Sequence, residues 1–271
     1  MCYLICFALI SCFLGIQGSR LPEDVIHNQD VGVVGGEDVP EGMLPYQVSL
    51  RHKGRVGSHF CGGSVLSNRW ILTAAHCTFS IGRAINDIEV VVGTVNLVKG
   101  GTHYSVKKII NHEDYDDQKV INDISLIKVS RVIKFNDLVQ PIRLPEKDTH
   151  AGTTLLLSGW GKTYITGKAS IILQMVKLNT LSVPDCQKRN IEPLVVSDKQ
   201  ICTLTVAGEG ACHGDSGGPL VDFSSKTLIG VVSWGSACAR GYPDVYTRVY
   251  AYKQWIMNNI FKDAMEEIIF N

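Results

Sequence analysis

One short run of residues combines a nucleophile with backbone groups that could stabilise charge on a substrate. Residues 211–219 read Ala-Cys-His-Gly-Asp-Ser-Gly-Gly-Pro, in which Ser216 offers a hydroxyl and Gly214 has no Cβ to obstruct a substrate. A serine hydroxyl is a weak nucleophile near neutral pH, so it needs a base such as histidine, whose ordinary pKa suits that task. The run makes hydrolysis by a nucleophilic serine the leading hypothesis.

A histidine and an aspartate that could complete such a site stand upstream. His76 lies in Leu-Thr-Ala-Ala-His-Cys at 72–77, and Asp123 lies in Asn-Asp-Ile-Ser-Leu-Ile-Lys-Val at 122–129. By resemblance to the chymotrypsin-like serine proteases, His76 would act as the base, and a buried Asp123 carboxylate would orient its imidazole and stabilise the imidazolium. The backbone N–H groups of Gly214 and Ser216 would bind the oxyanion that forms on the attacked carbonyl. Each residue alone is more often a surface or capping group, but three in these contexts favour catalysis.

These contexts, in the order histidine, aspartate, serine, resemble the chymotrypsin-like serine proteases from Val33 to about Phe261. The resemblance implies an all-β fold of two six-stranded antiparallel β-barrels with a C-terminal α-helix. The first barrel would supply His76 and Asp123, and the second Ser216. It also implies a serine endopeptidase that works through an acyl-enzyme, with protein and peptide substrates, protease inhibitors and an activating protease as partners.

Composition bounds the other classes of function. The chain has 271 residues, of which 45% are hydrophobic, and a formal net charge of zero. The first 32 residues hold one basic and three acidic residues, so the remainder carries a net charge of +2. Such a balance suggests neither nucleic acid nor an anionic membrane as a partner. We expect a monomer without a cofactor.

The first residues read as a targeting segment. Residues 2–14 are an apolar run, followed by the small residues Gly15, Gly18 and Ser19. The competing interpretation is a membrane anchor, but the run is shorter than the ~20 residues that span a bilayer. We therefore predict a signal peptide over 1–18, a propeptide over 19–32, and a protein secreted to the extracellular space, with the gut lumen suspected. After removal of the signal, no membrane contact is expected.

The cysteines support secretion. Of nine cysteines, three lie in the predicted signal peptide, and the remaining six are an even number suited to disulfides. The residues alone do not choose among the pairings, whereas the family resemblance implies Cys61–Cys77, Cys186–Cys202 and Cys212–Cys238. A metal site is the alternative, but no Cys-x-x-Cys pair occurs. Calcium is not expected either, because residues 94–102 lack the paired glutamates of calcium-binding trypsins.

Short β-branched runs separated by turn residues dominate from Val33 onward, as at 88–92, 153–157 and 227–232. This spacing is typical of an all-β barrel or sandwich. The protease domain is expected over 33–271, with barrel 1 at about 33–140 and barrel 2 at about 141–249. Apolar residues at three- and four-residue steps predict a helix over about 250–261. Residues 264–271 extend past the usual family terminus, as either a continuation of the helix or a frayed tail, and no function is assigned to them.

Activation departs from the family pattern. Val33-Val34-Gly35-Gly36 resembles the new amino terminus of an activated zymogen, whose ammonium would pair with Asp215 and order the oxyanion loop. Most relatives carry Arg or Lys before the cleaved bond, whereas Gly32 stands here. Arg20 is the single basic residue of the propeptide, and cleavage after it would leave extra residues that block insertion. We predict an unusual activator or inefficient activation.

The substrate pocket also departs from trypsins. Gly210, followed by Ala211, occupies the position of their pocket-base aspartate, and Asp244 occupies a wall position that is often glycine. Gly235 would keep the entrance open to Phe, Tyr or Leu, while Asp244 would tolerate some Arg or Lys. This arrangement resembles the broad-specificity chymotrypsins and collagenolytic proteases of arthropod guts. Alternatively, Asp244 pairs locally with Arg240 and only narrows the pocket.

Three further residues complete the expected pocket. Ser233 and Gly235, which flank Trp234, should offer backbone groups to an extended substrate strand. His213 at the mouth could modulate binding at about pH 6 to 7, or be an exposed histidine without such a role. A noncatalytic homologue that acts as a binding or cofactor protein is the competing function. Digestion is the expected role, because a broad pocket without accessory domains fits bulk protein hydrolysis.

Overall fold

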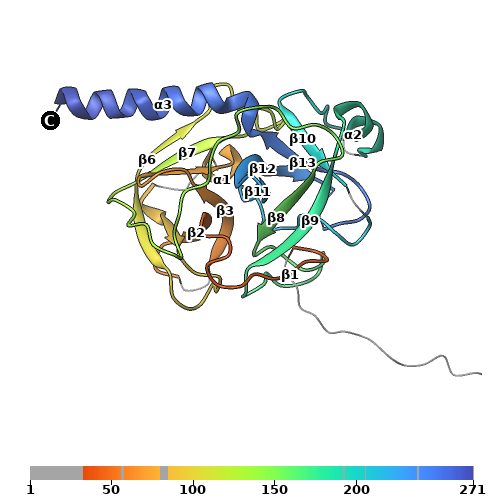
Figure 1. Ribbon diagram of the computed structural model, residues 1–271, viewed down its shortest axis with the longest axis horizontal. Helices are drawn as coiled ribbons and strands as arrows, with labels where there is room; N and C mark the ends of the chain where they lie inside the picture. Colours follow the sequence, from red (N-terminus) through yellow and green to blue (C-terminus); the bar gives the residue numbers. More distant parts are fainter. Residues whose placement is uncertain are drawn as a thin grey trace, which may run out of the picture.

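Two antiparallel β-barrels lie side by side, and a long helix runs across the first (Figure 1). The computed structural model describes residues 33–55, 58–79, 85–191, 193–204, 206–236 and 238–270. The predicted signal peptide and propeptide lie outside these residues and stay predictions. Within the described part of the chain, no helix is both long and apolar enough to cross a membrane.

The first barrel is closed by six strands in the order β2-β3-β4-β7-β6-β5. The β-branched runs found in the sequence form these strands because branched side chains pack well on a pleated, half-buried surface. Fully buried Leu50, Ile71 and Leu126 fill its interior. The strands are β2 (Gln47–His52), β3 (His59–Val65), β4 (Trp70–Thr73), β5 (Ile88–Val92), β6 (Thr102–Asn111) and β7 (Ser125–Val129).

The second barrel has the order β9-β10-β13-β12-β11-β8 and closes through pairing of β8 with β9. The short β1 (Glu37–Asp38) adds to it beside β9. Leu155, Leu157 and Tyr246 are fully buried in its core. The strands are β8 (Thr154–Gly159), β9 (Gln174–Leu181), β10 (Gln200–Thr203), β11 (Pro219–Asp222), β12 (Thr227–Gly235) and β13 (Asp244–Arg248).

Helices occupy the connections and the C-terminal end. The short α1 (Ala75–Phe79) follows β4, and a single 3₁₀ turn, η1 (Ile85–Asp87), precedes β5. The helix α2 (Val183–Arg189) begins where the Ser182 hydroxyl accepts a hydrogen bond from the Asp185 N–H, which satisfies one free donor of its first turn. The helix α3 (Val249–Phe270) follows β13 directly.

Disulfides tie these parts together. The structure contains Cys61–Cys77, Cys186–Cys202 and Cys212–Cys238, the three pairs that the resemblance implied. The first joins β3 to α1, and the second joins α2 to β10. The third joins the two loops on either side of the candidate pocket described below.

The predicted fold class, two six-stranded antiparallel barrels with a C-terminal helix, is confirmed. The helix is longer than the predicted 250–261, since it continues to Phe270. Lys128, buried on β7, forms ion pairs with Asp263 and Glu267 on this extension. Of the two alternatives for residues 264–271, the structure shows the helix continuation, and these ion pairs help to hold it against the barrel.

Candidate active site

His76 and Asp123 meet at the edge of the first barrel. His76 lies in α1, and Asp123 lies two residues before β7. The His76 Nδ1 atom lies 2.8 Å from Asp123 Oδ2, and the His76 backbone N–H donates to Asp123 Oδ1 at 2.9 Å. These two contacts fix the imidazole so that its other nitrogen, Nε2, faces away from the carboxylate.

Asp123 is buried yet charged. Burial alone would raise the pKa of Asp123, but the charge of His76 and hydrogen bonds from His76 and Ser233 hold it below its usual value. The second barrel supplies part of this support, because the Ser233 hydroxyl on β12 donates to Asp123 Oδ2 at 2.5 Å. The Thr247 hydroxyl on β13 also donates to the Asp123 carbonyl at 2.6 Å. The aspartate of one barrel is thus positioned by strands of the other.

Ser216 lies in the turn before β11, against the residues that carry His76. The Gly62 N–H donates to the Ser216 carbonyl at 2.7 Å, which anchors the turn on β3. A Cβ at Gly217 would lie 3.0 Å from Cys77 Sγ and would overlap the Thr73 hydroxyl, so only glycine fits this approach. The serine-bearing turn and the histidine-bearing helix are therefore neighbours.

Two backbone donors in the same turn have no hydrogen-bond acceptor among the described residues. Within the described residues, the N–H groups of Gly214 and Ser216 make no hydrogen bond, although the N–H of Asp215 between them donates to the Cys212 carbonyl at 3.0 Å. Gly214 has a φ of 104°, a conformation that glycine adopts readily and other residues rarely do. Such a pair of free N–H groups beside a hydroxyl is the geometry that receives an oxyanion.

His59 is a positioning residue that the sequence did not reveal. Its Nε2–H donates to the Gly214 carbonyl at 2.8 Å, and its Nδ1 accepts from the Ser49 hydroxyl at 2.9 Å. Burial lowers the pKa of His59 to about 4, so the ring is neutral and both bonds are defined by one tautomer. A lone histidine beside Phe60 carries no sequence signal of this role, because the contact spans 155 positions.

Asp215 is fully buried behind the turn. Its carboxylate accepts from the Gly161 N–H at 2.8 Å and the Cys212 N–H at 2.9 Å. A Cβ at Gly159 or Gly161 would overlap this carboxylate, so both glycines make room for it. Burial raises the pKa of Asp215 to about 7, and no cation among the described residues offsets that shift.

The expected amino-terminal residue already lies inside the fold. Val33 is fully buried in the same apolar cluster as Ala211. Val34 and Gly210 exchange two backbone hydrogen bonds of 3.1 Å, which dock this segment beside the candidate pocket. The structure therefore places the start of the described chain in the second barrel, next to the loop that leads to Asp215.

A pocket of about 180 Å³ opens beside Ser216. Of the residues expected to bind substrate, all but Gly210 line it; Cys212 and Val232, which the sequence did not suggest, line it too. Trp234 and Gly235 lie at the end of β12, and Asp244 begins β13. The pocket is lined by Ala211, Cys212, His213, Ser216, Val232, Ser233, Trp234, Gly235 and Asp244.

Asp244 is the acidic group of this pocket. Its Oδ2 accepts from the Ala211 N–H at 2.8 Å, and a Cβ at Gly210 would overlap the same oxygen. Burial, and then the charge of Asp215, raise the pKa of Asp244 to about 7, although the Ala211 bond lowers it. Arg240 is exposed, and in the described part of the chain it forms no ion pair with Asp244. The local pairing considered as the alternative is thus absent from the structure.

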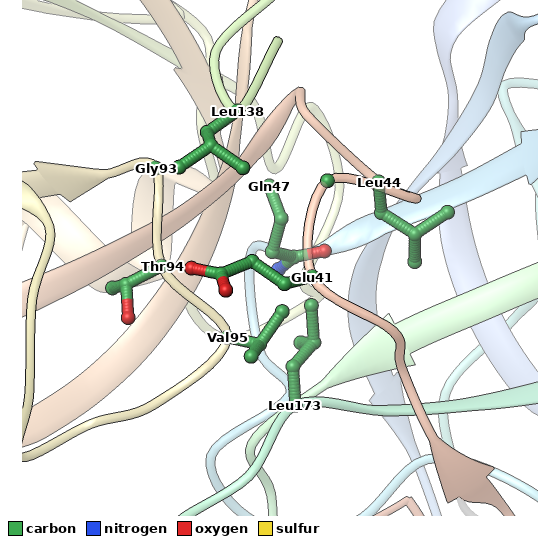
Figure 2. A pocket seen from close by; sticks show the side chains of 9 residues that line it. Glu41, Leu44, Gln47, Gly93, Thr94, Val95, Leu138 and Leu173 are labelled. Carbon is green, nitrogen blue, oxygen red and sulfur yellow. The ribbon is translucent and has the colours of Figure 1, made fainter.

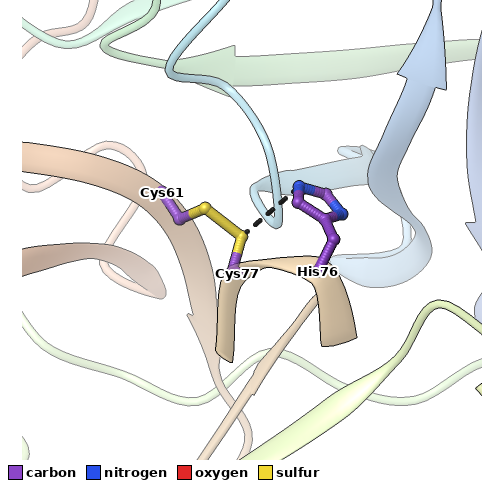
Figure 3. Close-up of side chains that lie close together, drawn as sticks. All are labelled: Cys61, His76 and Cys77. Carbon is purple, nitrogen blue, oxygen red and sulfur yellow. Dashed lines mark hydrogen bonds between the residues drawn. A yellow bond between two sulfur atoms is a disulfide. The ribbon is translucent and has the colours of Figure 1, made fainter. Parts of the chain in front are cut away.

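Two other features do not add a ligand site. His76 Nε2 lies 3.6 Å from Cys77 Sγ, and Figure 3 shows this sulfur joined to Cys61 in a disulfide. A disulfide sulfur offers no thiolate, so these three residues are not a metal centre. The small cavity of Figure 2, between Gln47, Thr94 and Leu173, measures about 10 Å³ and has room for about one water molecule.

Comparison with known proteins agrees with this geometry. Residues 33–256 match the family described as Trypsin. The chain is 45% identical over 228 residues to chymotrypsin-2 of Vespa crabro, covering 84% of this chain and 99% of that protein. It is 40% identical to trypsin 5G1 of Aedes aegypti, over 83% of each chain. Trypsin delta of Drosophila melanogaster is 36% identical over 261 residues, which cover 95% of this chain and 98% of that protein.

These matches span the same residues that carry the His76 and Asp123 pair, the Ser216 turn and the pocket. The match begins at Val33, where the described structure also begins. The chain belongs to the trypsin family of serine endopeptidases.

Proposed function

We propose that this endopeptidase is secreted, cleaves after large apolar residues such as Phe, Tyr and Leu, and also accepts some Lys and Arg. The observation that carries the proposal is the pocket beside Ser216, which has no carboxylate at Gly210 but a buried one at Asp244. An apolar side chain would fill the space between Val232 and Trp234, whereas a basic one would reach the Asp244 carboxylate. The relative named chymotrypsin-2 supports the apolar preference.

Ser216, His76 and Asp123 carry the chemistry of this proposal. The Ser216 oxygen attacks the scissile carbonyl carbon while its proton passes to His76 Nε2, and Asp123 stabilises the imidazolium. Collapse of the intermediate breaks the C–N bond, and His76 returns the proton to the leaving amine. Water then hydrolyses the acyl-enzyme by the same sequence of transfers. The N–H groups of Gly214 and Ser216 bind the oxyanion in both steps, each worth roughly 2.7–4 kcal/mol of transition-state stabilisation.

Activation in this proposal requires cleavage between Gly32 and Val33. The new Val33 ammonium would pair with Asp215, whose buried carboxylate has no cation beside it in the described residues. Because Gly32 is not a residue that trypsin-like activators cut after, a protease of different specificity performs the cleavage. Incubation of the uncut chain with trypsin alone should not release a chain that begins at Val33. N-terminal sequencing that found Val33 after trypsin treatment would contradict this.

The decisive experiment compares kcat/KM on peptides that differ only in Phe, Leu or Arg before the scissile bond. The enzyme is a chain that begins at Val33, and the Ser216→Ala variant is the control. We expect cleavage after Phe and Leu, slower cleavage after Arg, and no cleavage by the control. An Asp244→Gly variant should lose cleavage after Arg and keep cleavage after Phe.

The noncatalytic binding protein is the competing function, and the same experiment decides it. A folded sample with all three disulfides that cleaves none of the peptides would favour it. Extracellular digestion of proteins is the role that a broad pocket suits best. Secretion itself is tested by the N-terminus of the protein recovered from the medium of expressing cells, which should lack residues 1–18.

A further inference from the structure

The outward face of α3 carries a stripe of apolar side chains. Phe261 is 67% exposed, Ile268 is 73% exposed and Ile269 is 68% exposed, and the other members are exposed as well. Contiguous exposed apolar surface is uncommon on monomers and marks interaction sites. We call this surface the α3 stripe; it consists of Met257, Phe261, Ala264, Met265, Ile268 and Ile269.

The opposite face of the helix is already occupied. Asp263 and Glu267 form ion pairs with Lys128 of β7. Asp263 also pairs with Lys108 of β6, whose Nζ lies 2.9 Å from Asp263 Oδ1. Lys128 and Asp263 are both buried, so these contacts fix the rotation of the helix about its own axis. The α3 stripe must therefore face away from the barrel, and Figure 1 shows the helix running along the edge of the molecule.

We propose that two copies of this chain associate through the α3 stripe, with their α3 helices packed antiparallel. The spacing of the stripe carries this inference. Met257, Phe261, Ala264 and Ile268 follow one another at steps of four, three and four residues. Apolar residues at those steps form the seam of a coiled coil, in which each side chain inserts between residues of a second helix.

The seam is complementary to itself. A two-fold axis between Lys262 and Asp263 places Met257 of one copy opposite Ile268 of the other. It also places the large Phe261 opposite the small Ala264, so that ring and methyl group fill one layer without a void. No residue of the stripe carries a charge, so no like charges face each other across the axis.

The charge of α3 argues for a second copy over a membrane surface. The helix holds two lysines and three acidic residues. Helices that lie in membrane interfaces are typically rich in Lys and Arg on their polar face.

A single helix pair also buries less than the roughly 1,200–2,000 Å² of a standard stable interface. The dimer should therefore be weak and form in the micromolar range, in contrast to the monomer expected from the sequence.

The first test measures mass in solution. Sedimentation equilibrium of the full chain, carrying Ser216→Ala to prevent self-cleavage, should show a rise from monomer to dimer mass between about 1 µM and about 500 µM. Adding Ile268→Lys should weaken the dimer at least about tenfold, because a lysine would enter the seam. Val195→Lys is the matched control, since Val195 is apolar and also 73% exposed but belongs to the loop between α2 and β10 and not to the α3 stripe.

A second test reports the register. Met257→Cys protein mixed with Ile268→Cys protein should form an intermolecular disulfide under mild oxidation, because the two positions oppose each other. Neither variant alone should do so, since 11 residues at about 1.5 Å each separate a position from the same position of the other copy by about 16.5 Å, beyond disulfide reach.

Three results would overturn the proposal. They are a monomer at every concentration, a dimer that Ile268→Lys leaves unchanged, and equal cross-linking of the single variants. Co-sedimentation of a monomeric chain with phosphatidylcholine vesicles, lost in Ile268→Lys but kept in Val195→Lys, would assign the stripe to a lipid surface instead. All of these readouts are independent of peptidase activity.

Discussion

At the scale of single residues, the proposed substrate pocket contains one buried carboxylate, that of Asp244. Because Gly210 has no side chain, the Asp244 carboxylate of β13 occupies the space that a Cβ at this position would fill. Because Asp244 is buried and lies near the equally buried Asp215, its pKa is raised to about 7. Its charge therefore changes within the pH range in which the enzyme is expected to work.

Selectivity should consequently depend on pH. Above pH 7 the ionised Asp244 attracts Lys and Arg, and below pH 7 the neutral carboxyl favours Phe and Leu. The ratio of kcat/KM for Arg to that for Phe should rise about tenfold from pH 6 to pH 8, as does the ionised fraction of a group with that pKa. The pH dependence of the catalytic steps that both substrates share cancels in the ratio.

The control for this prediction is Asp244→Asn, which keeps the shape of the side chain but cannot ionise. Its selectivity ratio should be flat between pH 6 and pH 8. A wild-type ratio that does not change over this range would show that Asp244 does not titrate there, and an Asn variant that keeps the slope would assign it to another group.

At the scale of elements, ion pairs hold the end of α3 on the first barrel. Lys128 is buried on β7, and its charge is balanced by Asp263 and Glu267 of the extension. Burial would raise the pKa of Asp263, but hydrogen bonds from Lys128 and Lys108, with their charges, hold it below its usual value. The stabilisation is present above the unfolded pKa of this aspartate and is lost as pH falls through the folded one.

Truncation tests this element. Deletion of residues 263–271 removes both acidic partners of the buried Lys128, and breaking such a buried ion pair should cost on the order of 3 kcal/mol of unfolding free energy. Deletion of residues 268–271 keeps Asp263 and Glu267 and should change stability by less than about 0.5 kcal/mol. Urea denaturation in dilute solution at pH 7 measures both. Equal stability of the two truncated chains would rule out the ion pairs as the anchor.

At the scale of the whole molecule, the two barrels complete each other's site. Asp123 of the first barrel is held by Ser233 and Thr247 of the second, and the Gly214 carbonyl of the second accepts from His59 of the first. The buried Asp215 carboxylate has no cation beside it among the described residues. Its pKa is raised from 3.8 to about 7 by burial.

A raised aspartate pKa has a definite effect on stability. The fold favours the protonated form of Asp215. Its contribution to the free energy of unfolding is therefore fully present below about pH 4 and is lost as pH rises through 7. Cleavage before Val33 would supply an ammonium and offset this loss. The melting temperature of the cleaved chain should therefore exceed that of the uncut chain by more at pH 7.5 than at pH 5.

The difference should be at least about 2–4 °C, the shift that 1 kcal/mol produces in a domain of this size. Calorimetry of the Ser216→Ala chain, with and without cleavage, measures it. In the Asp215→Asn variant, cleavage should raise the melting temperature by the same amount at pH 7.5 and at pH 5. A cleaved chain with no added stability at pH 7.5 would argue against the Val33 and Asp215 pair.

Much of the fold followed from local patterns. The β-branched runs at 88–92 and 227–232 lie in β5 and β12, because alternation and branching act within a few residues. The sequence did not decide between a helix continuation and a frayed tail for residues 264–271, because the anchor Lys128 lies 135 positions from Asp263. The role of the Ser233 hydroxyl was missed for the same reason, since its partner Asp123 lies 110 positions away.

The sequence by itself determined which groups this protein has for chemistry: the serine run at 211–219, the contexts of His76 and Asp123, and Gly210 with Asp244. Residue types and short-range spacing carry that information. Only the tertiary structure decided that Asp244 is buried against Ala211 and not paired with Arg240, that His59 fixes the Gly214 carbonyl, and that α3 turns an apolar face outward. Those outcomes depend on distances and burial between residues far apart in the sequence, which are set only when the chain folds.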